Sequence, residues 1–98
     1  MPYAIITKDK PNSSALREQV RPEHLEYLTR HQSRLLAAGA QTDDAGTGGY
    51  GAVILLDTED RAEAERFIQE DPFAKAGLFD MVQVTRWRKG FFDGKRLI

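Results

Sequence analysis

The strongest structural signal in the chain is the apolar run Gly51–Leu56, which predicts a buried β-strand because no polar residue interrupts it. The glycine-rich residues 43–49 precede this run and predict a hairpin loop. They lack the following Lys-Ser or Lys-Thr pair that marks a phosphate-binding loop. Residues 58–69 follow the run and predict an amphipathic helix with Thr58 as its N-cap. The middle of the chain therefore contains a strand followed by a helix.

The N-terminal part predicts a strand, a helix and a second strand. Residues 3–7 are apolar and β-branched, and the polar residues 8–12 end that strand. The motif Arg21-Pro22-Glu23-His24-Leu25 predicts a helix start with His24 in the first turn, because proline is favoured where its missing N–H costs nothing. Leucines at helical spacing predict the apolar face of this helix, and Gly39 is predicted to cap its C-terminus. Residues 37–42 also fit a second strand. Those leucines are Leu25, Leu28, Leu35 and Leu36.

The C-terminal part begins with Asp71-Pro72-Phe73, which predicts the end of the preceding helix because proline disfavours helical geometry at the residue before it. A short turn over residues 73–76 follows and ends at Gly77. Residues 78–87 are rich in β-branched side chains and predict the last strand. Residues 88–98 are too apolar for a free tail. We expect them to pack on their own domain or on a partner subunit.

The order strand, helix, strand, strand, helix, strand predicts one α+β domain over residues 1–98 with the ferredoxin-like βαββαβ fold. In this fold a four-stranded antiparallel sheet carries two helices on one face. Apolar residues point to both faces of the strands, so the open face needs a cover. A second copy of the chain, sheet against sheet, is the simplest cover and predicts a homodimer.

Composition excludes several classes of protein. A formal net charge of −1 argues against a nucleic-acid-binding protein, which usually carries a basic excess. The absence of cysteine removes disulfides, thiolate nucleophiles and most zinc sites, and with only two histidines we expect no metal and no cofactor. No apolar run is long enough to span a membrane, and the N-terminus does not resemble a signal peptide. We therefore expect a cytoplasmic protein.

Three residues are candidates for acid/base chemistry. His24 is the first, because histidine titrates nearest neutrality, and Asp71 is the carboxylate we expect to meet it. Asp9, just after the first strand, is either a turn residue or a carboxylate at the mouth of a cleft. Each has a structural alternative: His24 as a surface or capping residue, Asp71 as the cap of the short turn. His31 fits a packing residue better than a catalytic one.

Several motifs together resemble the YciI-like, or YCII-related, family. They are Asp9 after the first strand, Arg17-x-x-x-Arg21-Pro22-x-His24-Leu25, Leu35-Leu36-x-Ala38-Gly39 and Asp71-Pro72-Phe73-x-x-Ala76-Gly77. The resemblance spans residues 3 to about 87. It implies a dimeric α+β barrel with a cleft that holds a paired His and Asp, here His24 and Asp71, with Asp9 as a third member. The family includes a dehydrochlorinase that acts on a chlorinated hydroxyquinol.

The chain departs from that family in two places: Ala52 stands where a small polar residue is common, and Ala40 where a proline is common. The first departure weakens any mechanism that needs a hydroxyl group in the cleft.

These residues favour a small-molecule lyase or isomerase that acts on a cyclic or aromatic compound. His24 would be the general base, Asp71 would orient it, and Asp9 would assist. Arg17 and Arg21 would hold an anionic or phenolate substrate, or form surface ion pairs. No nucleophile is evident, so elimination or isomerisation fits better than acyl transfer. One alternative is a non-catalytic dimeric module that binds a small ligand, and another is an accessory domain that docks a partner protein through the tail. The sequence does not identify the substrate.

Overall fold

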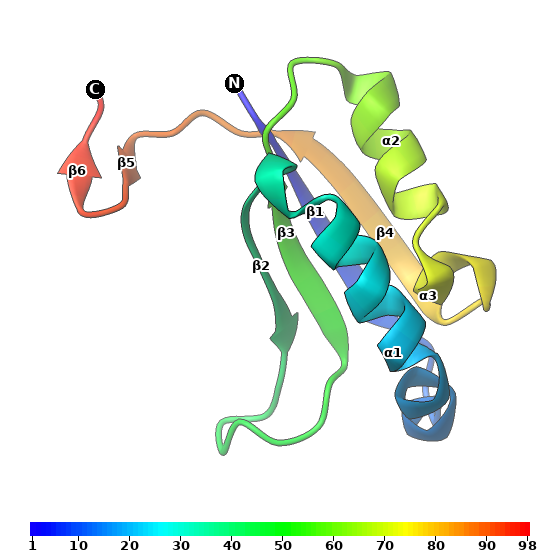
Figure 1. Ribbon diagram of the computed structural model, residues 1–98. Helices are drawn as coiled ribbons and strands as arrows, with labels where there is room; N and C mark the ends of the chain where they lie inside the picture. The colour runs from blue at the N-terminus through cyan, green and yellow to red at the C-terminus, as the bar shows by residue number, and fades with distance from the viewer.

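Four antiparallel strands in the order β2-β3-β1-β4 form the central sheet, and the helices cover one of its faces (Figure 1). The computed structural model describes residues 1–98. This arrangement confirms the predicted ferredoxin-like α+β fold. The sheet strands are β1 (Tyr3–Asp9), β2 (Leu35–Gln41), β3 (Gly51–Leu56) and β4 (Phe79–Arg86). The helices are α1 (Ser14–Arg30), α2 (Arg61–Gln69), α3 (Pro72–Lys75) and the single 3₁₀ turn η1 (Gln32–Arg34).

The core lies between the helices and the covered face of the sheet. Ile5 on β1 pairs with Ile54 on β3 and with Val84 on β4, so these three side chains point toward the helices. Phe67 and Ile68 of α2 are buried against them. The predicted bounds of β3 and the predicted end of α2 are confirmed, although the side chain of Asp60, not Thr58, caps α2 by accepting from the Ala62 N–H.

The first helix differs from its prediction at both ends. It begins at Ser14, so Pro22 lies inside it and His24 lies near its middle, not in its first turn. An interior proline removes one backbone hydrogen bond, a cost that the packing of α1 on the sheet offsets. The helix ends at Arg30, and Leu35 and Leu36 belong to β2, where Gly39 is a strand residue and not a helix cap. Pairing with β3 outweighs the helical spacing of those leucines.

Tyr27 of α1 makes the stability of the fold sensitive to pH in the alkaline range. It is buried, and its hydroxyl donates to the Phe67 carbonyl at 2.8 Å. Burial, with help from the charges of Glu70 and Asp71, raises the pKa of Tyr27 to about 12. The folded state therefore holds a proton that the unfolded state loses above about pH 10.

We expect the free energy of unfolding to fall as the pH rises from about 10 to 12, because only the unfolded state gains a tyrosinate there. Urea titrations across that range measure the slope. The Tyr27→Phe variant provides the control, since it removes the contribution of Tyr27 and leaves the other two tyrosines and the lysines unchanged. An equal slope in both proteins would contradict a role for Tyr27.

The open face of the sheet is apolar at its centre. Ile6 pairs with Val53, and Ala4 pairs with Leu55, so these side chains point away from the helices. Val53 is 42% exposed. No helix of the structure is both long and apolar enough to cross a membrane.

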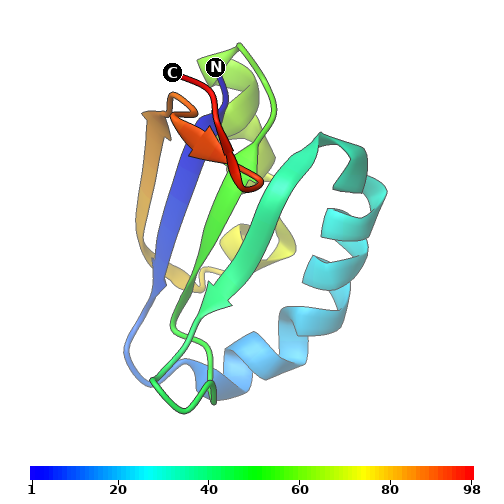
Figure 2. The ribbon, with the colours of Figure 1, turned by 90° about the vertical axis from the view of Figure 1, so that its left-hand side faces the viewer.

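The tail forms a small hairpin of β5 (Phe91–Phe92) and β6 (Lys95–Arg96), turned by Asp93 and Gly94 with positive φ angles of 54° and 71°. It lies on the open-face side of the sheet (Figures 1 and 2). Phe91 and Ile98 are both 68% exposed. Packing of this tail on its own domain or on a partner subunit stays a prediction.

Candidate active site

His24 and Asp71 meet between α1 and the N-terminus of α3. The Nδ1 atom of His24 lies 2.9 Å from both carboxylate oxygens of Asp71. The His24 side chain is 10% exposed and that of Asp71 is 0% exposed. The sequence predicted this pair as the chemical centre, and the structure brings the two residues into hydrogen-bond contact.

Asp71 is held by local backbone geometry. Pro72 keeps Asp71 in an extended conformation at the N-cap of α3, with φ −61° and ψ 133°. There its Oδ1 atom accepts a hydrogen bond from the Phe73 backbone N–H at 2.8 Å. Asp71 therefore caps the short helix and contacts His24 at the same time, so its two predicted roles, helix cap and partner of His24, are compatible.

This hydrogen bonding determines which nitrogen of His24 carries the proton. A carboxylate only accepts hydrogen bonds, and Asp71 already accepts one from the Phe73 N–H. The Nδ1 atom of His24 therefore donates to Asp71, and in the neutral imidazole Nε2 keeps its lone pair. An imidazole in this tautomer has the arrangement of a general base supported by a carboxylate.

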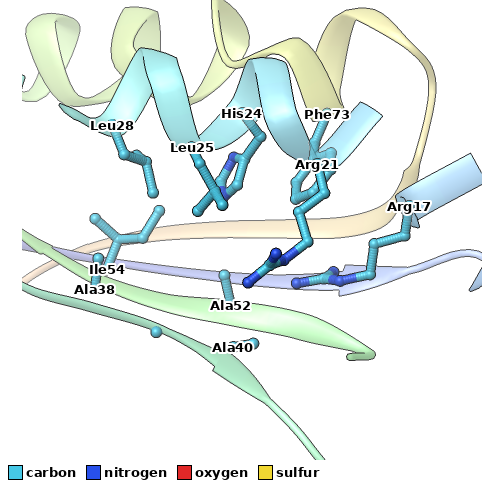
Figure 3. A pocket seen from close by; sticks show the side chains of 11 residues that line it. Arg17, Arg21, His24, Leu25, Leu28, Ala38, Ala40, Ala52, Ile54 and Phe73 are labelled. Atoms are coloured by element: carbon cyan, nitrogen blue, oxygen red, sulfur yellow. The ribbon is translucent and has the colours of Figure 1, made fainter. Parts of the chain in front are cut away.

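A cavity of about 190 Å³ lies in front of His24, between α1 and the strands β2 and β3 (Figure 3). Its floor consists of small and aliphatic side chains from the two strands, and α1 forms its roof. Ala52 is part of this floor, so this position offers no hydroxyl group to a ligand. The lining residues are Arg17, Arg21, His24, Leu25, Leu28, Ala38, Gly39, Ala40, Ala52, Ile54 and Phe73.

The two candidate arginines differ in their partners. Arg17 donates from Nη1 to Oδ2 of Asp9 at 2.7 Å, and both side chains are nearly buried. Arg21 takes part in none of the six ion pairs of the structure, although its side chain lines the cavity. Arg21 is thus the cation whose charge is free to meet an anionic ligand.

Asp9 lies beside Arg17, and no hydrogen bond joins it to His24 or Asp71. Its predicted role as a third member of the pair stays a prediction. The centroid of the His31 ring lies 4.8 Å from that of Tyr27 and 5.6 Å from that of Phe67, which agrees with a packing role for His31. No group of three or more His, Asp or Glu side chains is arranged to hold a metal ion.

Phe73 belongs to the Asp71-Pro72-Phe73 motif, but no functional role was predicted for it from the sequence. Its ring stacks on the His24 imidazole, with centroids 4.0 Å apart and planes inclined by 14°. The Cζ atom of Arg17 lies 5.0 Å from the centroid of the same ring. In the sequence, the only sign of this contact with His24 was an aromatic residue two positions after the candidate carboxylate, Asp71.

Comparison with known proteins gives consistent matches over most of the chain. The family model described as the YCII-related domain matches residues 1–88. Protein YciI of Escherichia coli O6:H1 and Protein YciI of Shigella flexneri are each 33% identical over 98 residues, which cover 93% of this chain and all of the relative.

One solved structure is also similar. It is 5-chloro-2-hydroxyhydroquinone dehydrochlorinase (TftG) from Burkholderia phenoliruptrix AC1100, in complex with 2,5-dihydroxybenzoquinone. The two chains are 32% identical, with a TM-score of 0.86, and the match covers 92% of this chain and 96% of the other.

Proposed function

The chain belongs to the YCII-related family, and we propose that it is a small-molecule lyase or isomerase in which His24 and Asp71 act as an acid/base pair. The observation that carries this proposal is the buried His24–Asp71 contact of 2.9 Å, which opens onto a cavity. The similarity to a dehydrochlorinase supports elimination from a cyclic or aromatic compound. We infer that the substrate is a small ring with acidic hydroxyl groups.

The proposed step is a proton transfer coupled to loss of a leaving group. In the keto tautomer of a chlorinated hydroxyquinol, the carbon that bears chlorine also bears a hydrogen atom. The Nε2 atom of His24 accepts a proton from a substrate hydroxyl group, and the electron pair of that O–H bond forms a C=O bond. The neighbouring C=C pair shifts toward the carbon that bears chlorine, and chloride departs with the C–Cl pair. For a chlorinated ring the products are the dehydrochlorinated ring, chloride and a proton held on His24. Asp71 stabilises the resulting imidazolium, and the proton then passes to water.

The direct test is incubation with 5-chloro-2-hydroxyhydroquinone, with release of chloride as the measurement. Saturable chloride release above the uncatalysed rate would support the lyase assignment. Binding of 2,5-dihydroxybenzoquinone without chloride release would favour a non-catalytic binding module, at least for this ring. Absence of both would direct the search to other anionic rings.

We propose that Arg21 binds the anionic group of the ligand. A guanidinium without a carboxylate partner, at the edge of an apolar cavity, favours a planar oxyanion. We expect Arg21→Gln to weaken binding of 2,5-dihydroxybenzoquinone by about tenfold, the loss of one charge-assisted hydrogen bond. Titration calorimetry measures this change. Arg30→Gln is the matched control, because Arg30 lies over the Tyr27 ring and outside the cavity lining; equal weakening in both variants would contradict a specific role for Arg21.

We propose that a second copy covers the open sheet face. The apolar centre formed by Ile6, Val53 and Leu55 lies on an open face that two copies can share about a two-fold axis. The tail hairpin lies on the same side, where it would reach that second copy (Figure 2).

We expect Val53→Asp to convert the dimer to a monomer, because it places an unpaired carboxylate in the apolar centre of that interface. Sedimentation equilibrium measures the change. Val82→Asp is the control: Val82 is 44% exposed, like Val53, but it pairs with Thr7 and so points to the helix-covered side. Dissociation by both variants, or by neither, would contradict the proposed interface.

A further inference from the structure

We infer that Phe73, clamped by the Asp9–Arg17 ion pair, is a positioning residue that fixes the plane of the His24 imidazole. The Phe73 ring is 1% exposed and lies nearly parallel to the imidazole at 4.0 Å. Arg17 contacts the same ring at 5.0 Å. This inference rests on the proposed role of His24 as the base, and it assigns Arg17 and Asp9 to the support of that base.

The hydrogen bond to Asp71 leaves one motion of His24 free. Both carboxylate oxygens contact the same atom, Nδ1, so they fix the position of that atom. The ring can still rock about the line from Nδ1 to the carboxylate, and this motion would move Nε2 within the cavity. A parallel aromatic face in van der Waals contact blocks it.

The support of Phe73 comes from two sides. Its backbone N–H is held by Asp71, so the hydrogen-bond acceptor and the stacking ring of His24 belong to one turn. Its side chain faces the guanidinium of Arg17, which Asp9 holds at 2.7 Å. The Phe73 ring thus contacts His24 and Arg17 at once, so a movement of the ring would also disturb its contact with the held guanidinium.

Arg17 itself has little room to move. Besides Asp9, its Nη2 atom lies 3.5 Å from the Gly51 carbonyl oxygen. A Cβ atom at Gly49 would lie 2.5 Å from Nε of Arg17, so the loop before β3 packs closely against this side chain. The guanidinium is enclosed and its charge is paired, which suits a support better than a group that captures substrate.

The ion pair is not explained well by stability alone. Both side chains are nearly buried, and the second oxygen of Asp9, Oδ1, is buried without a hydrogen-bond partner. A buried pair with an unsatisfied oxygen gains little over an apolar pair of the same size. We assign the Asp9–Arg17 pair a different function: it holds Phe73 against His24, which two flexible apolar side chains would do less well.

The test measures the His24 ring by NMR and does not depend on turnover. In Phe73→Leu we expect the Nδ1–H of His24 to exchange with water at least tenfold faster than in the parent protein, and the imidazole to show a mixture of tautomers. Phe79→Leu is the matched control, because Phe79 contacts Phe73 edge-on at 6.3 Å and is not stacked on His24. The resonances of His31 provide an internal reference.

A second variant keeps the inference testable if Phe73→Leu unfolds. The double variant Asp9→Asn, Arg17→Met removes both charges together and does not alter the Phe73 side chain itself. We expect it to speed exchange of the His24 Nδ1–H in the same direction. Where turnover is measurable, kcat should fall with KM unchanged, whereas Arg21→Gln should raise KM.

An unchanged exchange rate and a single tautomer in folded Phe73→Leu, or in the folded double variant, would overturn the inference. This result is distinguishable from failure of the proposed function. If the parent protein releases no chloride, the NMR measurement still reports whether Phe73 holds the imidazole.

Discussion

His24→Asn is expected to lower turnover by about 10²–10⁴-fold, the usual contribution of a general base, with little change in stability. The amide nitrogen of asparagine lies close to the position of Nδ1 and can donate to Asp71 as the imidazole does. It has no atom at the position of Nε2, so the base is lost and the contact with Asp71 is kept. Chloride release measures the activity, and urea denaturation measures the stability.

The comparison with His24→Ala separates chemistry from folding. Alanine removes the donor as well, and it leaves the buried Asp71 carboxylate with the Phe73 N–H as its remaining hydrogen-bond donor. We expect this variant to be destabilised by about 3–5 kcal/mol, as when one partner of a buried pair is removed. His31→Asn is the control for a histidine outside the cavity. Activity retained in His24→Asn would remove His24 from the mechanism.

Much of the fold followed from local sequence. Gly51–Leu56 is a strand in the structure as predicted, because an uninterrupted apolar run of this length in a small domain is typical of a buried strand. Asp71 was predictable as the residue where a helix must end, because Pro72 restricts it. The order of strands and helices then left the ferredoxin-like topology as the simplest arrangement.

The errors came from residues whose local signal was outweighed by distant partners. Pro22 marked a helix start in the sequence, but α1 begins at Ser14, and its packing on the sheet tolerates an interior proline. Leu35 and Leu36 continued a helical pattern, yet the pairing of β2 with β3 takes them into the sheet. Such pairing depends on residues far along the chain, and helical spacing carries no information about it.

The candidate site shows the same division. The motifs that carry His24 and Asp71 were visible in the sequence, and the structure brings the two side chains together. The partner of Arg17 was not predictable, because Asp9 and the stretch of Gly49 and Gly51 reach it from two separate segments of the chain. The sequence also offered a cap and a catalytic partner as alternatives for Asp71. One carboxylate with two oxygens can act as both, so the alternatives did not exclude each other.

This double role leads to the second prediction: Asp71→Asn should lower turnover by about 10²–10⁴-fold, as loss of the base in His24→Asn does, and leave the cap of α3 in place. Asparagine caps helices as well as aspartate does, so its single amide oxygen can accept from the Phe73 N–H. Its amide nitrogen then faces His24 and donates to Nδ1. The imidazole proton moves to Nε2, and the base is lost although every heavy atom keeps its place. The equivalent change in Ser-His-Asp proteases lowers kcat by about 10⁴-fold through the same change of tautomer.

Three measurements test the effect of Asp71→Asn. Chloride release gives the loss of turnover, ¹⁵N shifts of the His24 imidazole report the change of tautomer, and urea denaturation is expected to show only a small loss of stability. Asp60→Asn is the matched control, because Asp60 caps α2 through the Ala62 N–H and has no histidine beside it. If Asp71→Asn kept the turnover of the parent protein, Asp71 would be a cap alone, and His24 would act without a carboxylate to set its tautomer.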